Sequence, residues 1–177
     1  MSNNIKHQII RRILVSLLLV LSLFLLSACG TKLTRYRKEL SQHVDVIVKD
    51  TETLESTLSK LQSALSAQDG VIYEEQLEVL RSVCDEMVTE YKAIGDAEAP
   101  EEYVEYQKML KDYAKEITDT IAAMPELYTL AGGAIGSELS DEAISRIGEL
   151  QRKVAAASLK ADEFDKVLNA VLGFEEE

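Results

Sequence analysis

The feature that most constrains this fold is an apolar heptad pattern over residues 40–65. Its members alternate steps of four and three residues: Leu40, Val44, Ile47, Thr51, Leu54, Leu58, Leu61 and Leu65. A helix with this period buries one face against another helix. The pattern therefore predicts a long helix over about 33–68 with a coiled-coil-like contact face. Asp69-Gly70 should end it, because glycine readily adopts the left-handed conformation common after a helix.

Three further segments repeat apolar residues at helical spacing, and the predicted helices run over about 71–94, 100–124 and 140–172. Pro100 suits a first helical turn, where its missing N–H has no intrahelical partner. Pro125 should end or kink the third of these four helices, and an extension to about 131 stays open. Ser140 is followed by two acidic residues, a pattern typical of a helix start.

Four amphipathic helices with short connections, and no alternating strand pattern, predict an all-α fold. We expect an antiparallel four-helix bundle of long helical hairpins over 33–174, with an acidic tail at 175–177. In this topology the last helix returns toward the start of the first, and brings the tail near the bases at 32–38. The helix at 71–94 is shorter than the long helices at 33–68 and 140–172, so it should leave part of them uncovered. We expect this uncovered flank near the membrane anchor, and we expect it to bind a partner.

Residues 1–30 differ from the rest of the chain. Three bases, Lys6, Arg11 and Arg12, precede residues 13–26, which are apolar except for two serines. This run is shorter than the roughly 20 apolar residues that a stable membrane span needs. Small residues and a cysteine follow it directly. A basic start, an apolar run and small residues are the parts of an export signal.

The segment resembles the signal peptide of bacterial lipoproteins, with a lipobox that reads Leu26-Ser27-Ala28-Cys29. The resemblance implies a diacylglycerol thioether on Cys29, a lipoprotein carrying fatty acids such as palmitate, and cleavage between Ala28 and Cys29. Residues 1–28 would be removed and 29–32 would form a lipidated tether on the extracytoplasmic face of a bacterial membrane. Two alternatives stay open: an uncleaved membrane helix, and a secretory signal cut after Ala28 that leaves a free thiol.

Charge narrows the range of partners. Removing residues 1–28, with three bases and no acids, lowers the formal net charge from −12 to −15. Such an acidic domain lacks the basic footprint of a nucleic-acid-binding protein. Positive charge gathers close to the anchor, at Lys32, Arg35, Arg37 and Lys38. These bases are expected to contact anionic lipid at the membrane surface, at about 1 kcal/mol per base, and the acidic tail is their alternative partner.

Residues with catalytic or metal-binding chemistry are sparse. His43 is the only histidine after residue 28 and has no second histidine or cysteine at ligand spacing, so we expect a solvated side chain and neither metal nor cofactor. Cys84 lies on an apolar helical stripe and is expected to be a buried thiol, with an intermolecular disulfide as the alternative. Carboxylate pairs such as Glu101 and Glu105 are ordinary helix acids with no histidine beside them in sequence. These features favour a protein that is not an enzyme.

The sequence therefore favours a lipid-anchored, non-enzymatic helical protein that acts through protein–protein contacts in the bacterial cell envelope. Its partner would be another envelope protein, and a homodimer through the helix at 33–68 is also compatible with a heptad pattern. The alternative is a lipoprotein that binds a small or apolar ligand in a helical cleft. The residues available to such a cleft are the tyrosine stripe Tyr103, Tyr106 and Tyr113 and the loop at Gly132-Gly133.

Overall fold

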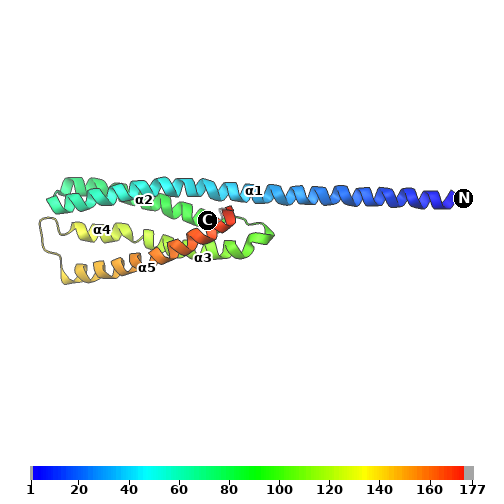
Figure 1. Cartoon of the computed structure of the whole chain (residues 1–177). Coiled ribbons are helices and arrows are strands. Elements are labelled where there is room, and N and C mark those ends of the chain that lie inside the picture. The colour runs from blue at the N-terminus through cyan, green and yellow to red at the C-terminus, as the bar shows by residue number, and fades with distance from the viewer. Residues whose placement is uncertain (1, 174–177) are drawn as a thin grey trace.

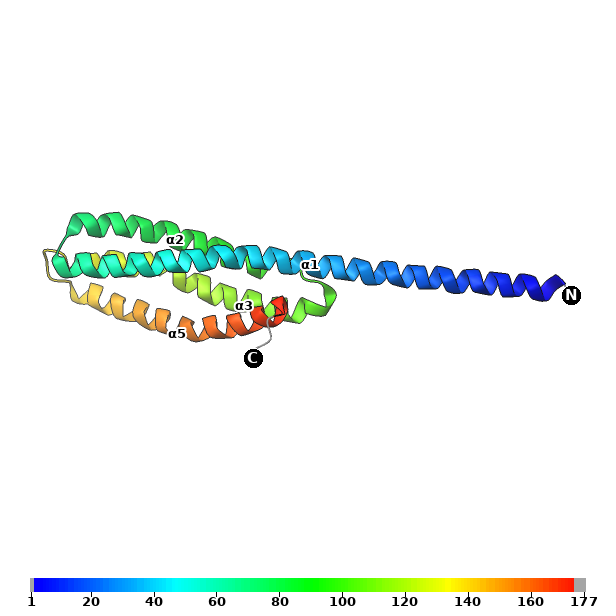
Figure 2. The same ribbon diagram turned by 45° about the horizontal axis from the view of Figure 1, so that its top comes forward.

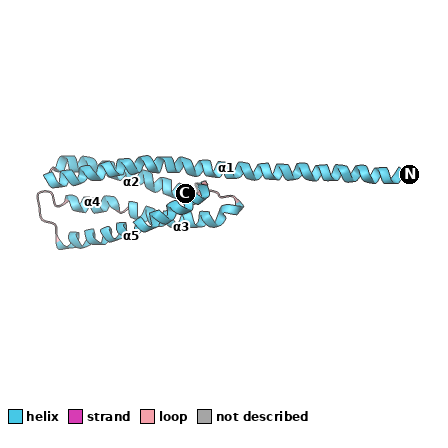
Figure 3. Cartoon of the chain, viewed as in Figure 1, coloured by secondary structure: helices cyan, strands magenta, loops and turns pink. Residues whose placement is uncertain are grey.

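The computed structural model describes the backbone of residues 2–173 and the side chains of residues 32–155 and 160–173. All of its regular elements are helices, and no strand occurs in the described backbone (Figure 3). The elements are α1 (Ser2–Ala67), α2 (Gly70–Asp96), the short 3-10 helix η1 (Glu101–Tyr103), α3 (Val104–Ile121), α4 (Met124–Gly132) and α5 (Asp141–Leu172). The chain is an all-α helical bundle, as the sequence predicted.

The helices run antiparallel in chain order (Figures 1 and 2). α1 extends far beyond the bundle toward the N-terminus, and α2 returns beside it. We call the end of the bundle from which α1 extends the proximal end, marked by Tyr36, residues 97–100 and Gly173. The opposite end, with the connections at 68–69 and 133–140, is the distal end. α3 and α4 together form the third helix of the bundle, and α5 returns to the proximal end.

The helices do not all pack equally. α1 packs along α2, while α3 packs between α2 and α5. At the distal end α4 takes the place of α3, between the α1–α2 hairpin and α5 (Figure 1). Contact between α1 and α5 is sparse and includes Arg37 with Val171 near the proximal end. The bundle is therefore two hairpins joined mainly through α2.

A single apolar core runs through the bundle. Its fully buried members come from α1, α2, α3 and α5: Tyr36, Leu40, Leu61, Tyr73, Leu77, Leu80, Cys84, Ile94, Leu110, Phe164 and Val171. No residue of α4 is fully buried. The distal part of the bundle is accordingly less enclosed than the proximal part.

The predicted contact face of α1 is only partly correct. Leu40, Ile47 and Leu61 are buried, but Val44, Thr51, Leu54, Leu58 and Leu65 are only half-buried. The other buried positions are one residue earlier in each heptad, at Asp50, Thr57 and Ala64. α1 packs chiefly on α2, so its most buried face is turned toward that one neighbour.

The helix ends follow local chemistry. The Asp69 carboxylate accepts a hydrogen bond from the Ile72 amide, and the Ser140 hydroxyl accepts one from the Ala143 amide, so both residues cap the helices that they precede. α3 ends at Ile121, before Pro125, and Pro125 lies in the first turn of α4. A proline is tolerated there because the first turn lacks intrahelical acceptors for its N–H groups.

Among the described residues the core at the proximal end is covered, so the prediction of an uncovered flank there is wrong. Tyr36, Leu40, Ile94 and Val171 are all at most 2% exposed there. The segment between α2 and α3 fills the space that the shorter α2 leaves, and its residues Ala97, Ala99 and Tyr103 pack against the core.

α1 begins at Ser2 rather than at about Leu33, and it passes through the predicted tether at 29–32. The side chains of the lipobox and the whole acidic tail at 175–177 lie outside the described residues. Among the side chains that are described, no helix is both long enough and apolar enough to span a membrane.

Candidate functional site

The four predicted membrane-contact bases do not share one environment. Lys32, Arg35 and Lys38 are exposed. Arg37 is half-buried: its Nε donates a hydrogen bond to the Val171 carbonyl over 2.7 Å, and its Nη2 donates one to the Tyr103 hydroxyl over 3.2 Å. Arg37 therefore satisfies a carbonyl at the end of α5. Contact with lipid stays a prediction for the four bases, and three of them present their charge to solvent.

An open groove lies between α4 and the first turns of α5, at the distal end. It has a volume of about 650 Å³ and is lined by Glu126, Leu130, Ser140, Glu142, Ala143, Ser145, Arg146 and Glu149. A hollow of about 390 Å³ continues it toward α3, and adds Asp119, Leu150 and Lys153. We call the two together the distal groove.

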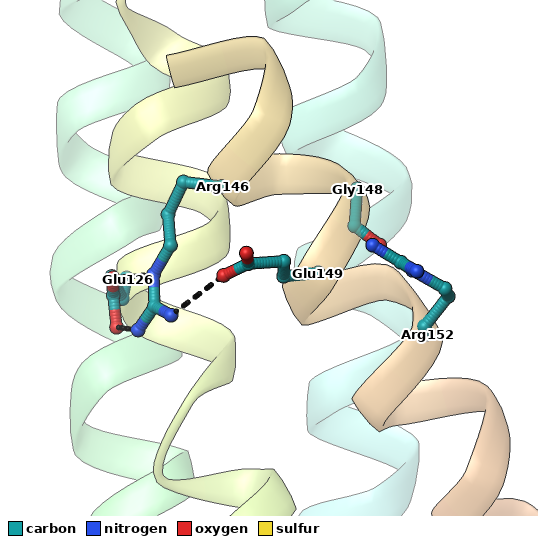
Figure 4. A network of polar contacts seen from close by, with 5 residues as sticks. All are labelled: Glu126, Arg146, Gly148, Glu149 and Arg152. Carbon is teal, nitrogen blue, oxygen red and sulfur yellow. Dashed lines mark hydrogen bonds and ion pairs between the residues drawn. The ribbon is translucent and has the colours of Figure 1, made fainter. Parts of the chain in front are cut away.

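Glu126, Arg146 and Glu149 line both parts of the distal groove. They form an ion-pair network centred on Arg146 (Figure 4). Arg146 binds Glu126 through two parallel contacts, Nε to Oε1 at 2.7 Å and Nη2 to Oε2 at 3.1 Å. Its Nη1 also lies 3.2 Å from Oε2 of Glu149, one helical turn away. The two contacts to Glu126 have a fork geometry that links α4 to α5.

The network favours the charged forms of Glu126 and Arg146. Hydrogen bonding from Arg146, and secondarily its positive charge, lowers the pKa of Glu126. Hydrogen bonds to Glu126 and Glu149 raise the pKa of Arg146. The Ser140 hydroxyl already caps α5. Fixed charges of this kind suit recognition more than proton transfer near neutral pH.

The groove combines surplus acid with an apolar floor. Arg146 is matched by Glu126 and Glu149, whereas Glu142 and Asp119 form no ion pair with any described residue. Apolar lining comes from Leu130, Ala143 and the buried Leu150. Such a surface is complementary to basic and apolar side chains of a partner.

His43 is not the solvated residue that the sequence suggested. Its Nδ1 lies 2.6 Å from Oε2 of Glu90 on α2, and both side chains are largely covered. Asp50, two turns further along α1, is only 4% exposed, and its Oδ2 has no hydrogen-bond partner in the described part of the chain. Burial, together with the negative charges of Glu86 and Glu90, raises the pKa of Asp50. A signal for Asp50 exists in the sequence, since it lies three residues after Ile47 on the core side of α1.

These acidic and imidazole groups do not form a metal centre. Within the described residues, no group of three or more histidine, cysteine, aspartate or glutamate side chains is arranged to hold a metal ion. Cys84 is buried as expected, and burial raises the pKa of its thiol to about 12.

The residues put forward for a ligand cleft do not come together. Tyr103 and Tyr106 lie near each other at the proximal end, with ring centroids 6.0 Å apart. Gly132 is the last residue of α4 and packs on the ring of Tyr73, which has its hydroxyl bonded to the Tyr128 carbonyl at 2.6 Å. The small size of Gly132 thus serves helix packing, and Gly133 lies exposed beside it.

The predicted homodimer face overlaps the core of this chain. Leu40, Ile47 and Leu61 are buried inside the bundle, so a second copy would have to use the half-buried side of α1. That side contains Val44 and Leu58.

Comparison with known proteins adds no further assignment: no protein-family model, curated protein or solved structure matches this chain.

Proposed function

We propose that this chain is a lipid-anchored, non-enzymatic protein of a bacterial envelope that binds a protein partner through its distal groove. The anchor is supported by the lipobox at residues 26–29, with its basic start and apolar run. The protein would lie on the extracytoplasmic face of the membrane, held by the lipid on Cys29.

The observation that carries the binding role is the position of the distal groove. It lies at the end of the bundle opposite to the N-terminal extension of α1 (Figure 1). Residues 32–67 of α1 span roughly 50 Å at 1.5 Å per residue. A protein anchored at Cys29 would therefore hold the groove well away from the lipid, toward other envelope proteins. The Arg146 network links α4 to α5 beside the groove and would help to keep its shape before the partner arrives.

Site-specific crosslinking in cells tests this role. A photoreactive amino acid replaces Ser145, an exposed residue that lines the groove, and in a matched strain it replaces Ser82, an exposed serine of α2. We expect one dominant envelope protein to be captured from position 145 and not from position 82. Equal capture from both positions, or capture from neither, would contradict the assignment of the groove as the binding site.

A further inference from the structure

A second cavity lies at the proximal end, between α1 and the segment that joins α2 to η1. Its volume is about 300 Å³. α1 contributes Lys32, Arg35, Tyr36 and Glu39, which share one helix face because their spacing is three, four and seven residues. The opposite wall is formed by residues 98–102. We call this cavity the proximal pocket.

Basic and acidic side chains both line the proximal pocket, and the acids outnumber the bases. The bases Lys32 and Arg35 lie on the α1 wall together with Glu39, and Glu98, Glu101 and Glu102 lie on the opposite wall. None of these residues forms an ion pair within 4 Å in the described part of the chain. The neighbouring Arg37, in contrast, is bound to Val171 and Tyr103 and does not line the pocket.

The bottom of the proximal pocket is formed by a buried, hydrogen-bonded side chain. Tyr36 is 2% exposed, and its hydroxyl donates a hydrogen bond to Oε1 of Gln107 over 2.5 Å. Gln107 in turn donates to the carbonyls of Ile94 and Gly95 at the end of α2. Half-buried Pro100 adds an apolar part to the loop wall. The cavity is therefore built on bonded core residues, with the charges at its mouth.

We propose that the proximal pocket binds a headgroup with one phosphodiester and one primary ammonium, the phosphoethanolamine class. Lys32 and Arg35 would bind the phosphate, since both side chains are standard phosphate ligands. The ammonium would donate hydrogen bonds to the carboxylates of the loop wall, because an –NH₃⁺ group has three donors. An anionic headgroup without an amine leaves these carboxylates unpaired and meets their repulsion.

The source of this headgroup is the lipid surface, and that part of the inference rests on the proposed anchor at Cys29. Lys32 follows Cys29 by three residues, about 4.5 Å of helix rise. The pocket would then lie at the level of the phospholipid headgroups. The sequence predicted membrane contact for all the bases near the anchor. The proximal pocket assigns headgroup binding to Lys32 and Arg35, which line it, and not to Lys38, which does not.

A soluble headgroup tests the pocket without requiring lipidation. The full-length protein in non-ionic detergent is titrated with glycerophosphoethanolamine, and backbone amide signals are followed by NMR. We expect saturable shifts at residues 98–102. Glycerophosphoglycerol, which lacks the ammonium, and ethanolamine, which lacks the phosphate, should bind at least about tenfold more weakly, because each loses charge-assisted hydrogen bonds. Absence of saturable shifts, or equal binding of the three compounds, would overturn the proposal.

Paired variants identify the walls of the pocket. Lys32→Gln with Arg35→Gln, and separately Glu101→Gln with Glu102→Gln, should each weaken glycerophosphoethanolamine binding about tenfold or more. Lys38→Gln and Glu105→Gln remove equally exposed charges outside the pocket and should leave binding unchanged. Unchanged amide signals elsewhere in the chain show that each variant is folded. Equal effects of the control and pocket variants would contradict the assignment.

Membranes distinguish a lipid source from a free compound. The mature protein is placed in nanodiscs of phosphatidylethanolamine or of phosphatidylglycerol, and hydrogen exchange is measured at residues 98–102. Slower exchange in phosphatidylethanolamine supports the lipid headgroup, and equal exchange overturns it in favour of a soluble phosphoamine. An unmodified Cys29 would contradict the proposed anchor but would leave the soluble titration intact, so the two failures are separable.

Discussion

Arg37 and Val171, which are 134 residues apart in the chain, are joined by a hydrogen bond from the guanidinium Nε to the carbonyl oxygen over 2.7 Å. The carbonyl belongs to the last turn of α5, where intrahelical partners run out. Gly173 follows at φ 85°, and a Cβ at this residue would approach Nη1 of Arg37 to 3.3 Å. The contact closes the proximal end of the bundle by linking α1 to α5.

Replacing Arg37 by alanine should lower the free energy of unfolding by about 1.5–3 kcal/mol, because a charged donor to a partly buried carbonyl is lost. Urea denaturation of the full chain measures this value. Lys38→Ala is the control, since Lys38 is exposed and the change should alter stability by no more than about 0.5 kcal/mol. If the two substitutions cost the same, Arg37 does not have the structural role assigned to it.

Two glycines should respond to alanine with opposite signs. At Gly132 a Cβ would lie 2.5 Å from Cε1 of Tyr73, a ring that is 1% exposed, so Gly132→Ala should destabilise the protein by about 1–3 kcal/mol through overpacking. At Gly148, within α5, a Cβ meets open space. Gly148→Ala should therefore stabilise the protein by about 0.5–1 kcal/mol. Thermal unfolding of both variants checks the pair, and a stabilising Gly132→Ala would show that α4 does not pack on Tyr73.

Titration of Asp50 should lower the free energy of unfolding as the pH rises. Burial, with Glu86 and Glu90 adding repulsion and Lys49 opposing it, raises its pKa above the ordinary value of 3.8. The folded chain therefore binds this proton more tightly than the unfolded chain, and the Asp50 contribution falls as the pH rises from about 3.8 through the raised pKa.

Asp50→Asn removes that titration and should be more stable than the wild type at pH 7, with the advantage shrinking as the pH approaches 3.8. Urea denaturation across this pH range measures the difference. Asp45→Asn, at an exposed position of the same helix, should show no comparable gain. An advantage of Asp50→Asn that persists undiminished at low pH would argue against a titrating Asp50.

Cys84 should be unreactive in the folded protein. It is 1% exposed, and burial raises its pKa to about 12, so almost no thiolate is present at pH 8. We expect labelling by a thiol reagent only at the rate of unfolding, and rapid labelling in urea. Fast labelling of Cys84 in the native protein, or a dimer linked through Cys84 under oxidising conditions, would contradict this prediction.

Charge reversal in the distal groove should weaken capture of the partner. Glu142→Lys replaces a groove carboxylate that has no ion-pair partner among the described residues, and so should lower the crosslinking yield from position 145. Raising the salt concentration should lower the same yield, because it screens exposed charges. Glu74→Lys, at an exposed position of α2, is the matched control. An equal loss of yield in both variants would mean that overall charge, rather than the groove, controls capture.

Local chemistry explains why the elements were predictable. The helix predicted over 71–94 is Gly70–Asp96, and the one predicted over 140–172 is Asp141–Leu172. Their starts follow from capping side chains that bond to amides three residues ahead, Asp69 to Ile72 and Ser140 to Ala143. Information of this kind lies within a few residues of sequence.

The side of each helix that is buried, and the sites between helices, depend on distant neighbours. The α1 heptad predicted Thr51 and Leu58 in the seam, but the structure buries Asp50 and Thr57 because α1 faces mainly α2. Thr57 is accommodated by donating its hydroxyl to the Thr53 carbonyl.

The candidate site could not be predicted from the sequence for the same reason. Arg146 and Glu126 come from different helices, so their spacing of 20 residues carried no local signal. The acids of residues 98–102 likewise met the bases of α1 only through the fold.

The most direct test of a lipid-anchored protein is the mass of its N-terminal peptide, taken from protein extracted from the membranes of the cells that make it. We predict that residues 1–28 are absent and that the mature chain begins at Cys29, with the added mass of a diacylglycerol group and its fatty acids. A peptide that retains residues 1–28, or a mature chain with an unmodified Cys29, would contradict the anchor.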